Sequence, residues 1–208
     1  MKRIIFILIL LIQQSVFGQI ITNNINCLIS DISEDYYLSH NDVGIRLDTN
    51  NKLKKENNSY NIKLNNNKNI ILTDSNSEDN PSYVKYLYIG RFNNYLCFEV
   101  YYYEISKILL INDYNGEKIE IIGNIYISPD MKYLINASQI MEYDQMPNII
   151  QIWLMDNYKL NLITNINLED NWIPENIKWI DNNTILFQKL HYNNTKSWEK
   201  ISINNISE

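Results

Sequence analysis

A repeated set of four short apolar runs constrains the fold of this chain more than any other feature of its sequence. The runs are rich in Ile, Tyr, Leu and Val, which favour strands, and turn-forming residues separate them. The stretch that begins at Tyr88 aligns with the one that begins at Tyr126, 38 positions later, and a third copy begins at Trp179, another 53 positions along. A unit of four short strands at such a period predicts stacked antiparallel sheets.

Two turns carry the strongest local signals. In the stretch YISPDMKYLI, Pro129 has the backbone angle that the second position of a turn requires, and a strand is predicted on each side. The pair Asn115-Gly116, which has β-formers on both sides, is typical of a tight hairpin. Residues 83–123 and 124–166 are therefore each predicted to form a four-stranded meander.

The remaining parts of the chain are less regular. The third unit covers residues 177–204, and the stretch EDNWIP before it is predicted to be a loop between sheets. Residues 20–29 are interpreted as a short lead-in, and residues 31–72 as a degenerate fourth sheet. The predicted fold of residues 19–208 is a single all-β domain with antiparallel four-stranded blades, arranged in a small or incomplete β-propeller-like stack.

The sequence SPDMKYL, with IQIWLMDNYKLNLI downstream, resembles the WD40-like, or TolB-like, propeller repeats of exported bacterial proteins. Those repeats commonly carry Ser-Pro-Asp-Gly-Lys, and Met131 stands where they usually have Gly. We expect a type I turn there, which needs no left-handed residue at this position. The resemblance covers residues 83–203 and implies blades of a propeller. A closed ring needs at least about four blades of 40 to 45 residues, so the sequence leaves ring closure open.

The first residues of the chain have the pattern of a secretory signal. Lys2 and Arg3 are followed by nine apolar residues and then by the small-residue pair Val16 and Gly18. This pattern predicts a signal peptide over residues 1–18 and a periplasmic or extracellular location. The apolar stretch is about half as long as the roughly 20 residues that span a bilayer, so we expect no membrane span after cleavage. An uncleaved anchor is the alternative.

Charge and motifs exclude several classes of function. The formal net charge of -6 argues against a nucleic-acid partner, which would require a basic face. The sequence has only two His and five Gly, and it lacks Cys-x-x-Cys, His-Glu-x-x-His and Gly-x-Ser-x-Gly. We therefore expect no metal, no cofactor and no catalytic residue. Its short acidic groups are interpreted as solvated loops.

The two cysteines allow two interpretations. Cys27 and Cys97 could form a disulfide in an oxidising compartment. Cys97 lies in the apolar run YLCF, however, where a buried free thiol would behave as a small apolar side chain.

Aromatic residues are the candidate binding groups. Neighbouring side chains of a strand point to opposite faces, so some of these rings should be exposed. Tyr and Trp dominate the binding energy of many interfaces. The candidates are Tyr101, Tyr103, Trp153, Trp172, Trp179 and Trp198. Packing between sheets is the alternative role for these rings.

The expected function is that of an exported, non-catalytic binding or scaffold module whose partner is a protein, peptide or glycan. An inhibitor or immunity-type protein that blocks an enzyme through an acidic surface, such as residues 75–81, is the first alternative. A hydrolase that uses loop carboxylates is the second.

Overall fold

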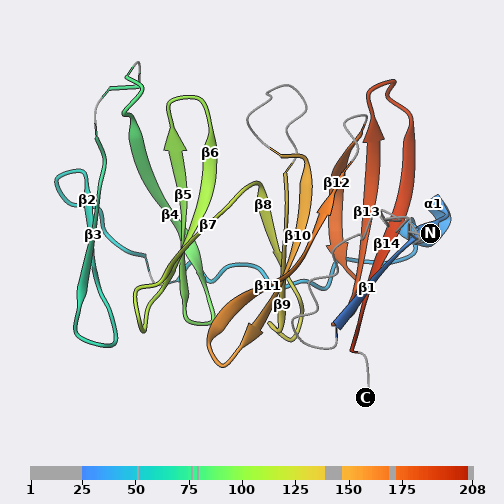
Figure 1. Cartoon of the computed structure of the whole chain (residues 1–208), viewed down its shortest axis with the longest axis horizontal. Coiled ribbons are helices and arrows are strands. Elements are labelled where there is room, and N and C mark those ends of the chain that lie inside the picture. The colour runs from blue at the N-terminus through green and yellow to red at the C-terminus, as the bar shows by residue number, and fades with distance from the viewer. Residues whose placement is uncertain are drawn as a thin grey trace, which may run out of the picture.

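The computed structural model describes residues 25–50, 52–75, 77–78, 80–138, 147–168 and 172–205. The predicted signal peptide lies outside these ranges. These ranges contain four antiparallel sheets and one short helix, and Figure 1 shows the sheets arranged one after another along the longest axis of the molecule, with the helix at one end. The sheets do not close into a ring, so the predicted incomplete, β-propeller-like stack of antiparallel blades is confirmed.

Three sheets have four strands and one has two. Sheet 1 is the hairpin of β2 (Ser59–Lys63) and β3 (Asn69–Thr73). Sheet 2 contains β4 (Val84–Phe92), β5 (Tyr95–Tyr102), β6 (Ser106–Asn112) and β7 (Lys118–Ile121). Sheet 3 contains β8 (Asn124–Ile127), β9 (Tyr133–Ala137), β10 (Ile149–Asp156) and β11 (Lys159–Asn167). Sheet 4 contains β12 (Trp172–Trp179), β13 (Thr184–His191), β14 (Lys196–Asn205) and β1 (Ile25–Ile32).

Sheet 4 joins the two ends of the chain. Strand β1 pairs with β14 in antiparallel register, from Ile25 opposite Asn205 to Ile32 opposite Trp198. Residues 25–29 of the predicted lead-in therefore belong to a strand, and residues 20–24 lie outside the described ranges. The third repeat unit provides only three of the four strands in its sheet, and the beginning of the chain provides the fourth.

The stretch predicted as a loop before the third unit is partly a strand. Trp172 and Pro174 lie in β12, while residues 169–171 lie outside the described ranges. Pro174 has no backbone N–H for a strand ladder, but β12 is an edge strand and can accommodate it. A loop was predicted because this stretch is extra length before the third repeat unit, and the sequence does not show that part of it forms an edge strand.

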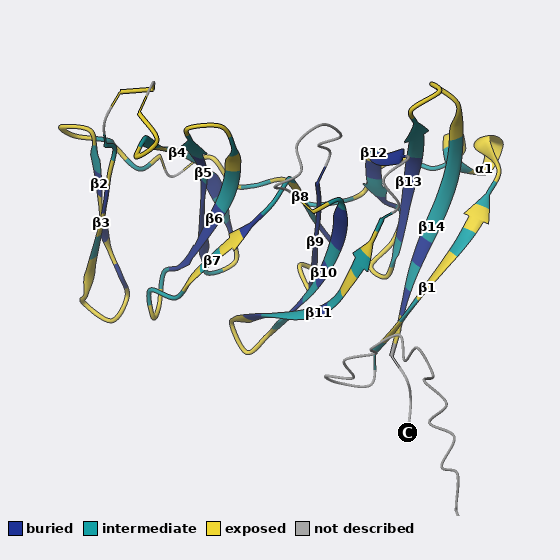
Figure 2. Ribbon diagram, turned by 45° about the horizontal axis from the view of Figure 1, so that its top comes forward, coloured by how far each residue is buried: buried dark blue, intermediate teal, exposed yellow. Residues whose placement is uncertain are grey.

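Three apolar cores hold the stack together, and each lies between adjacent sheets. Ile62, Leu72 and Phe98 belong to the core between sheets 1 and 2. Tyr95, Leu110 and Leu134 belong to the core between sheets 2 and 3. Ile135, Trp179 and Phe187 belong to the core between sheets 3 and 4. Figure 2 shows the resulting pattern, with buried central strands and exposed turns.

Residues 31–72 do not form the degenerate four-stranded sheet that the sequence suggested. They contain the end of β1, the helix α1 (Glu34–Leu38), an extended segment and the hairpin of sheet 1. Ser33 caps the helix, because its Oγ accepts a hydrogen bond from the backbone N of Tyr36 at 3.2 Å. The acidic pair at the start of the helix, interpreted as a solvated loop, lies in its first turn, where the helix dipole favours negative charge.

The helix lies beyond sheet 4 at one end of the stack (Figure 1). Lys178 Nζ donates to the carbonyl oxygens of Tyr37 and His40, both at 2.6 Å, and lies 3.6 Å from the centre of the Tyr37 ring. Tyr37 Oη donates to the carbonyl of Asn176 at 2.7 Å. These contacts fasten the helix to β12 and protect this end of the open stack.

The turn between β8 and β9 combines the expected turn type with an unexpected backbone conformation. Met131 N donates to the carbonyl of Ser128 at 2.9 Å, with Pro129 at the second position. Met131 itself has a φ of 57°, which is the left-handed region. The expectation that this turn needs no left-handed residue is therefore wrong. The turn closes at Met131, and Met131 itself must take a left-handed conformation for the chain to enter β9.

Replacing Met131 with glycine is expected to raise the free energy of unfolding by about 1 kcal/mol. An L-residue in the left-handed region costs roughly 1–2 kcal/mol, and the greater freedom of glycine in the unfolded chain offsets part of the gain. Urea unfolding of the two proteins measures the difference. Met131→Ala is the control, since it shortens the side chain without relieving the backbone, and an equal gain in both variants would contradict the explanation.

Candidate binding cleft

An extended segment, residues 42–49, crosses the stack from α1 towards sheet 1 (Figure 1). We call it the crossing segment. Its backbone amides donate to the carbonyl of one residue in each of three sheets: Val43 to Trp179 at 2.9 Å, Ile45 to Ile127 at 3.0 Å, and Asp48 to Arg91 at 2.8 Å. Each acceptor lies at or next to the last residue of an edge strand, which is β12 in sheet 4, β8 in sheet 3 and β4 in sheet 2. One stretch of backbone therefore links sheets 4, 3 and 2.

Asp42 and Gly44 fix the start of the crossing segment. Asp42 Oδ1 accepts hydrogen bonds from the backbone N of Gly44 at 3.0 Å and of Trp179 at 3.1 Å. A Cβ atom at Gly44 would lie 3.0 Å from both the carbonyl oxygen of Ile127 and Cδ1 of Trp179, so glycine permits this close approach.

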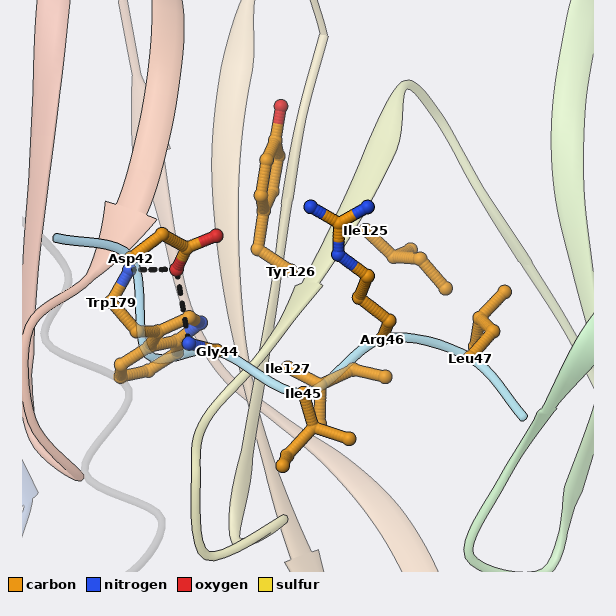
Figure 3. A pocket seen from close by; sticks show the side chains of 9 residues that line it. All are labelled: Asp42, Gly44, Ile45, Arg46, Leu47, Ile125, Tyr126, Ile127 and Trp179. Atoms are coloured by element: carbon orange, nitrogen blue, oxygen red, sulfur yellow. Dashed lines mark hydrogen bonds between the residues drawn. The ribbon is translucent and has the colours of Figure 1, made fainter.

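A cleft of about 330 Å³ lies between the crossing segment and two strands, β8 of sheet 3 and β12 of sheet 4. Its volume is within the range of small-ligand sites. Figure 3 shows the side chains that line it. Its apolar wall is formed by Ile45, Leu47, Ile125, Ile127 and Trp179. Besides the indole N–H of Trp179, the side chains with polar groups at the cleft are those of Asp42, Arg46 and Tyr126.

Arg46 is the distinctive charged group of this cleft. Its side chain extends beside Ile125 and Tyr126 (Figure 3), and the residue is exposed. The described residues show no ion pair or hydrogen bond for its guanidinium, while Asp42 uses Oδ1 to hold backbone amides. An unpaired guanidinium beside an apolar wall is suited to a ligand that has an apolar body and a carboxylate, because the guanidinium can bind both carboxylate oxygens.

Tyr126 and Trp179 add neutral polar groups. Burial raises the pKa of Tyr126, and the nearby Asp42 carboxylate raises it further, while a hydrogen bond with Asn124 lowers it. The net effect is a raised pKa, so the hydroxyl remains protonated at neutral pH. Trp179 is 1% exposed, and its Nε1 has no hydrogen-bond partner among the described residues. An unpaired buried donor costs about 1–3 kcal/mol.

A second cleft, of about 400 Å³, lies further along the chain, where Thr49, Lys52 and Leu53 face sheets 1 and 2. Tyr60 and Tyr88 line it together with Lys52. The hydroxyl of Tyr88 is buried and lacks a hydrogen-bond partner among the described residues, while its backbone N donates to Tyr60 Oη at 3.2 Å. The N-terminal part of the chain thus forms one side of both clefts.

The structure does not bring the six predicted aromatic residues together. Trp172 and Trp179 are buried in the core between sheets 3 and 4. Trp153 packs against the core between sheets 2 and 3, and its Nε1 donates to Asn136 Oδ1 at 2.7 Å.

The other three predicted residues lie on separate parts of the surface. Tyr101 and Trp198 are half-buried, on β5 and β14 respectively. Tyr103, which follows β5, is 47% exposed. Sequence reasoning missed Arg46 and Tyr126, since their proximity depends on the path of the crossing segment.

Cys27 and Cys97 are free thiols. Cys27 packs against the core between sheets 3 and 4, whereas Cys97 lies in the core between sheets 2 and 3. Sheet 3 separates them, so the disulfide that the sequence allowed is not formed, and the buried-thiol interpretation describes Cys97. Burial raises the pKa of Cys27 to about 11 and that of Cys97 to about 12, which makes both thiols poor nucleophiles at neutral pH.

Within the described ranges, no three His, Cys, Asp or Glu side chains are grouped as a metal site. The same part of the chain contains no helix with the length and apolarity to span a membrane. Comparison of the chain with models of protein families, with curated protein sequences and with solved structures gives no match.

Proposed function

We propose that this protein is an exported, non-catalytic binding module that holds a small carboxylate ligand, or the carboxylate end of a peptide, in the cleft beside the crossing segment. The observation that carries the proposal is the guanidinium of Arg46, which has no partner among the described residues and lies beside a cleft of about 330 Å³ with an apolar wall. The apolar wall would bury the body of the ligand, and Arg46 would bind its carboxylate.

Export and a relationship to WD40-like repeats belong to the same proposal. The residues 1–18 support export by their signal-like pattern. The relationship is supported by the SPDMKYL turn and by two successive four-stranded meanders, β4–β7 and β8–β11. The inhibitor and hydrolase alternatives stay predictions, and no described group favours them over the cleft.

The test compares two ligands that differ in one charge. N-acetyl-phenylalanine is expected to bind the protein at least about tenfold more tightly than N-acetyl-phenylalanine amide, since a hydrogen bond to a charged group contributes about 1.5–3 kcal/mol. Arg46→Gln should remove this preference while leaving the amide's weaker binding unchanged. Isothermal titration calorimetry measures all four affinities.

Lys85→Gln is the matched control, because Lys85 is an exposed cation on β4 that does not line the cleft. This variant should keep the preference for the carboxylate. Equal affinity for both ligands, no binding of either, or a preference that survives Arg46→Gln would contradict the proposed site.

A further inference from the structure

Two bulky residues occupy left-handed backbone positions, where the described chain otherwise places Asn or Gly. Nine non-glycine residues of the described chain have a positive φ between 47° and 64°, and seven of them are Asn, which tolerates this conformation. The other two are Met131, with a φ of 57°, and Tyr158, with a φ of 62°. A bulky side chain is disfavoured there, and such outliers gather at functional sites.

Two side-chain amides, one of them buried, hold the backbone of Tyr158. Its carbonyl accepts hydrogen bonds from Asn94 Nδ2 at 2.8 Å and from Asn112 Nδ2 at 3.0 Å. Asn112 is 3% exposed, and its Oδ1 accepts a hydrogen bond from the backbone N of Tyr114 at 3.0 Å. The turns that carry Tyr114 and Tyr158 are therefore fixed on either side of one buried side chain.

Tyr114, Met131 and Tyr158 form what we call the tyrosine rim. They lie in the β6–β7, β8–β9 and β10–β11 turns, which are all at the same end of the sheets (Figure 1). Their exposed fractions are 65%, 39% and 70%. The β8–β9 turn is also bound to β10, since Met155 N donates to the carbonyl of Lys132 at 2.8 Å. The three side chains are thus presented to solvent from a fixed backbone.

The charges beside the tyrosine rim occur in pairs of opposite sign, among them Asp130 and Lys132 on either side of Met131. Arg91 donates to Asp113 at 2.7 Å, beside Tyr114. Asp156 and Lys159 face each other across the β10–β11 turn. A surface with aromatic and thioether side chains and balanced charge favours a partner surface that is apolar and close to neutral.

We propose that the tyrosine rim binds a protein partner through an extended segment that has apolar and aromatic side chains and little net charge. Asn, which occupies the other seven non-glycine positions of positive φ in the described chain, would fit positions 131 and 158 at lower cost. Tyr and Met are both enriched at protein interfaces, where a few such residues contribute most of the binding energy. None of its three residues lines the cleft beside Arg46.

The test uses a displayed library of random linear peptides, selected against the intact protein. The selected peptides are expected to share aromatic and apolar residues. Tyr158→Asn and Met131→Gly should each weaken their binding about tenfold or more, as expected for interface hot spots. Both variants should unfold at a higher urea concentration than the wild type, because each relieves a strained backbone. Reduced binding by a more stable protein is a result that a purely structural role would not produce.

Tyr103→Asn is the matched control. Tyr103 is an exposed tyrosine in the β5–β6 turn, at the opposite end of the sheets, and this variant should keep full peptide binding. A selection that yields no binders, or peptides whose affinity is unchanged by Tyr158→Asn, would overturn the proposal. A glycan array offers a second contradicting result. If neutral glycans bind the protein and lose binding in Tyr158→Asn, while peptide binding does not depend on Tyr158, the tyrosine rim binds carbohydrate and the proposed protein partner is wrong.

Discussion

Replacing Trp179 with alanine is expected to lower the free energy of unfolding by about 3–5 kcal/mol, the usual cost of truncating a large buried aromatic side chain. Trp179 is almost fully buried in the core between sheets 3 and 4, and the stacking of these two sheets depends on that core. Urea unfolding followed by circular dichroism measures the loss. The expected result identifies this indole as a packing group of the core whose edge also lines the cleft.

Trp198→Ala is the control for this experiment. Trp198 is partly exposed on β14, so its removal should cost less than the removal of Trp179, because less apolar area is buried. A change below about 1 kcal/mol for Trp179→Ala would contradict the described core, since surface substitutions have effects of that size.

Deleting residues 25–32 is expected to lower the free energy of unfolding by more than about 4 kcal/mol, which is a large part of the stability of an ordinary domain. The deletion removes β1, exposes the edge of β14 and uncovers Ile201 and Ile203, which are both buried. An unprotected strand edge with apolar neighbours also promotes aggregation. Urea unfolding and sedimentation of the shortened chain measure both effects.

A chain that begins at Ile25 is the reference for this deletion, because it keeps the whole of β1. A synthetic peptide of residues 25–32 added to the shortened chain should restore part of the lost stability by occupying the free edge of β14. An unfolding free energy that is the same with and without β1 would show that the beginning of the chain does not complete sheet 4.

Strands joined by tight turns could be predicted from the sequence because the interactions that define them are local. Asn115-Gly116 and Pro129 mark turns of sheets 2 and 3, and the apolar runs beside them form the expected strands. The pairing of β1 with β14 could not be predicted, because almost the full length of the chain separates the two strands. An alternating apolar pattern indicates a strand but does not identify its partner.

The binding cleft was beyond sequence reasoning for a related reason. The alternation Val43-Gly44-Ile45-Arg46-Leu47 predicts a strand, yet the segment forms only isolated bridges, at Ile45 and Asp48. The alternation does place Ile45 and Leu47 towards the core and Arg46 towards solvent. The hydrogen-bond acceptors of this segment lie in three different sheets, so no local pattern could identify them.

The aromatic residues show the limit of alternation more clearly. A period of two tells which side chains share a face, but it does not tell whether another sheet covers that face. Trp172 and Trp179 face a neighbouring sheet and are buried. Tyr114 and Tyr158, which are more exposed, lie in stretches that the sequence predicts to be turns. Their location in predicted turns was the sequence feature that could have indicated their exposure.

Amide hydrogen exchange in the crossing segment tests the central claim, which is that this segment is fixed across three sheets and forms one side of the binding cleft. The amides of Val43, Ile45 and Asp48 should exchange slowly, because each donates to a carbonyl of a different sheet. The amide of Arg46, for which the described residues provide no acceptor, should exchange faster and is the internal reference. Equally fast exchange at all four amides would show that the segment is not held in place and would contradict the cleft.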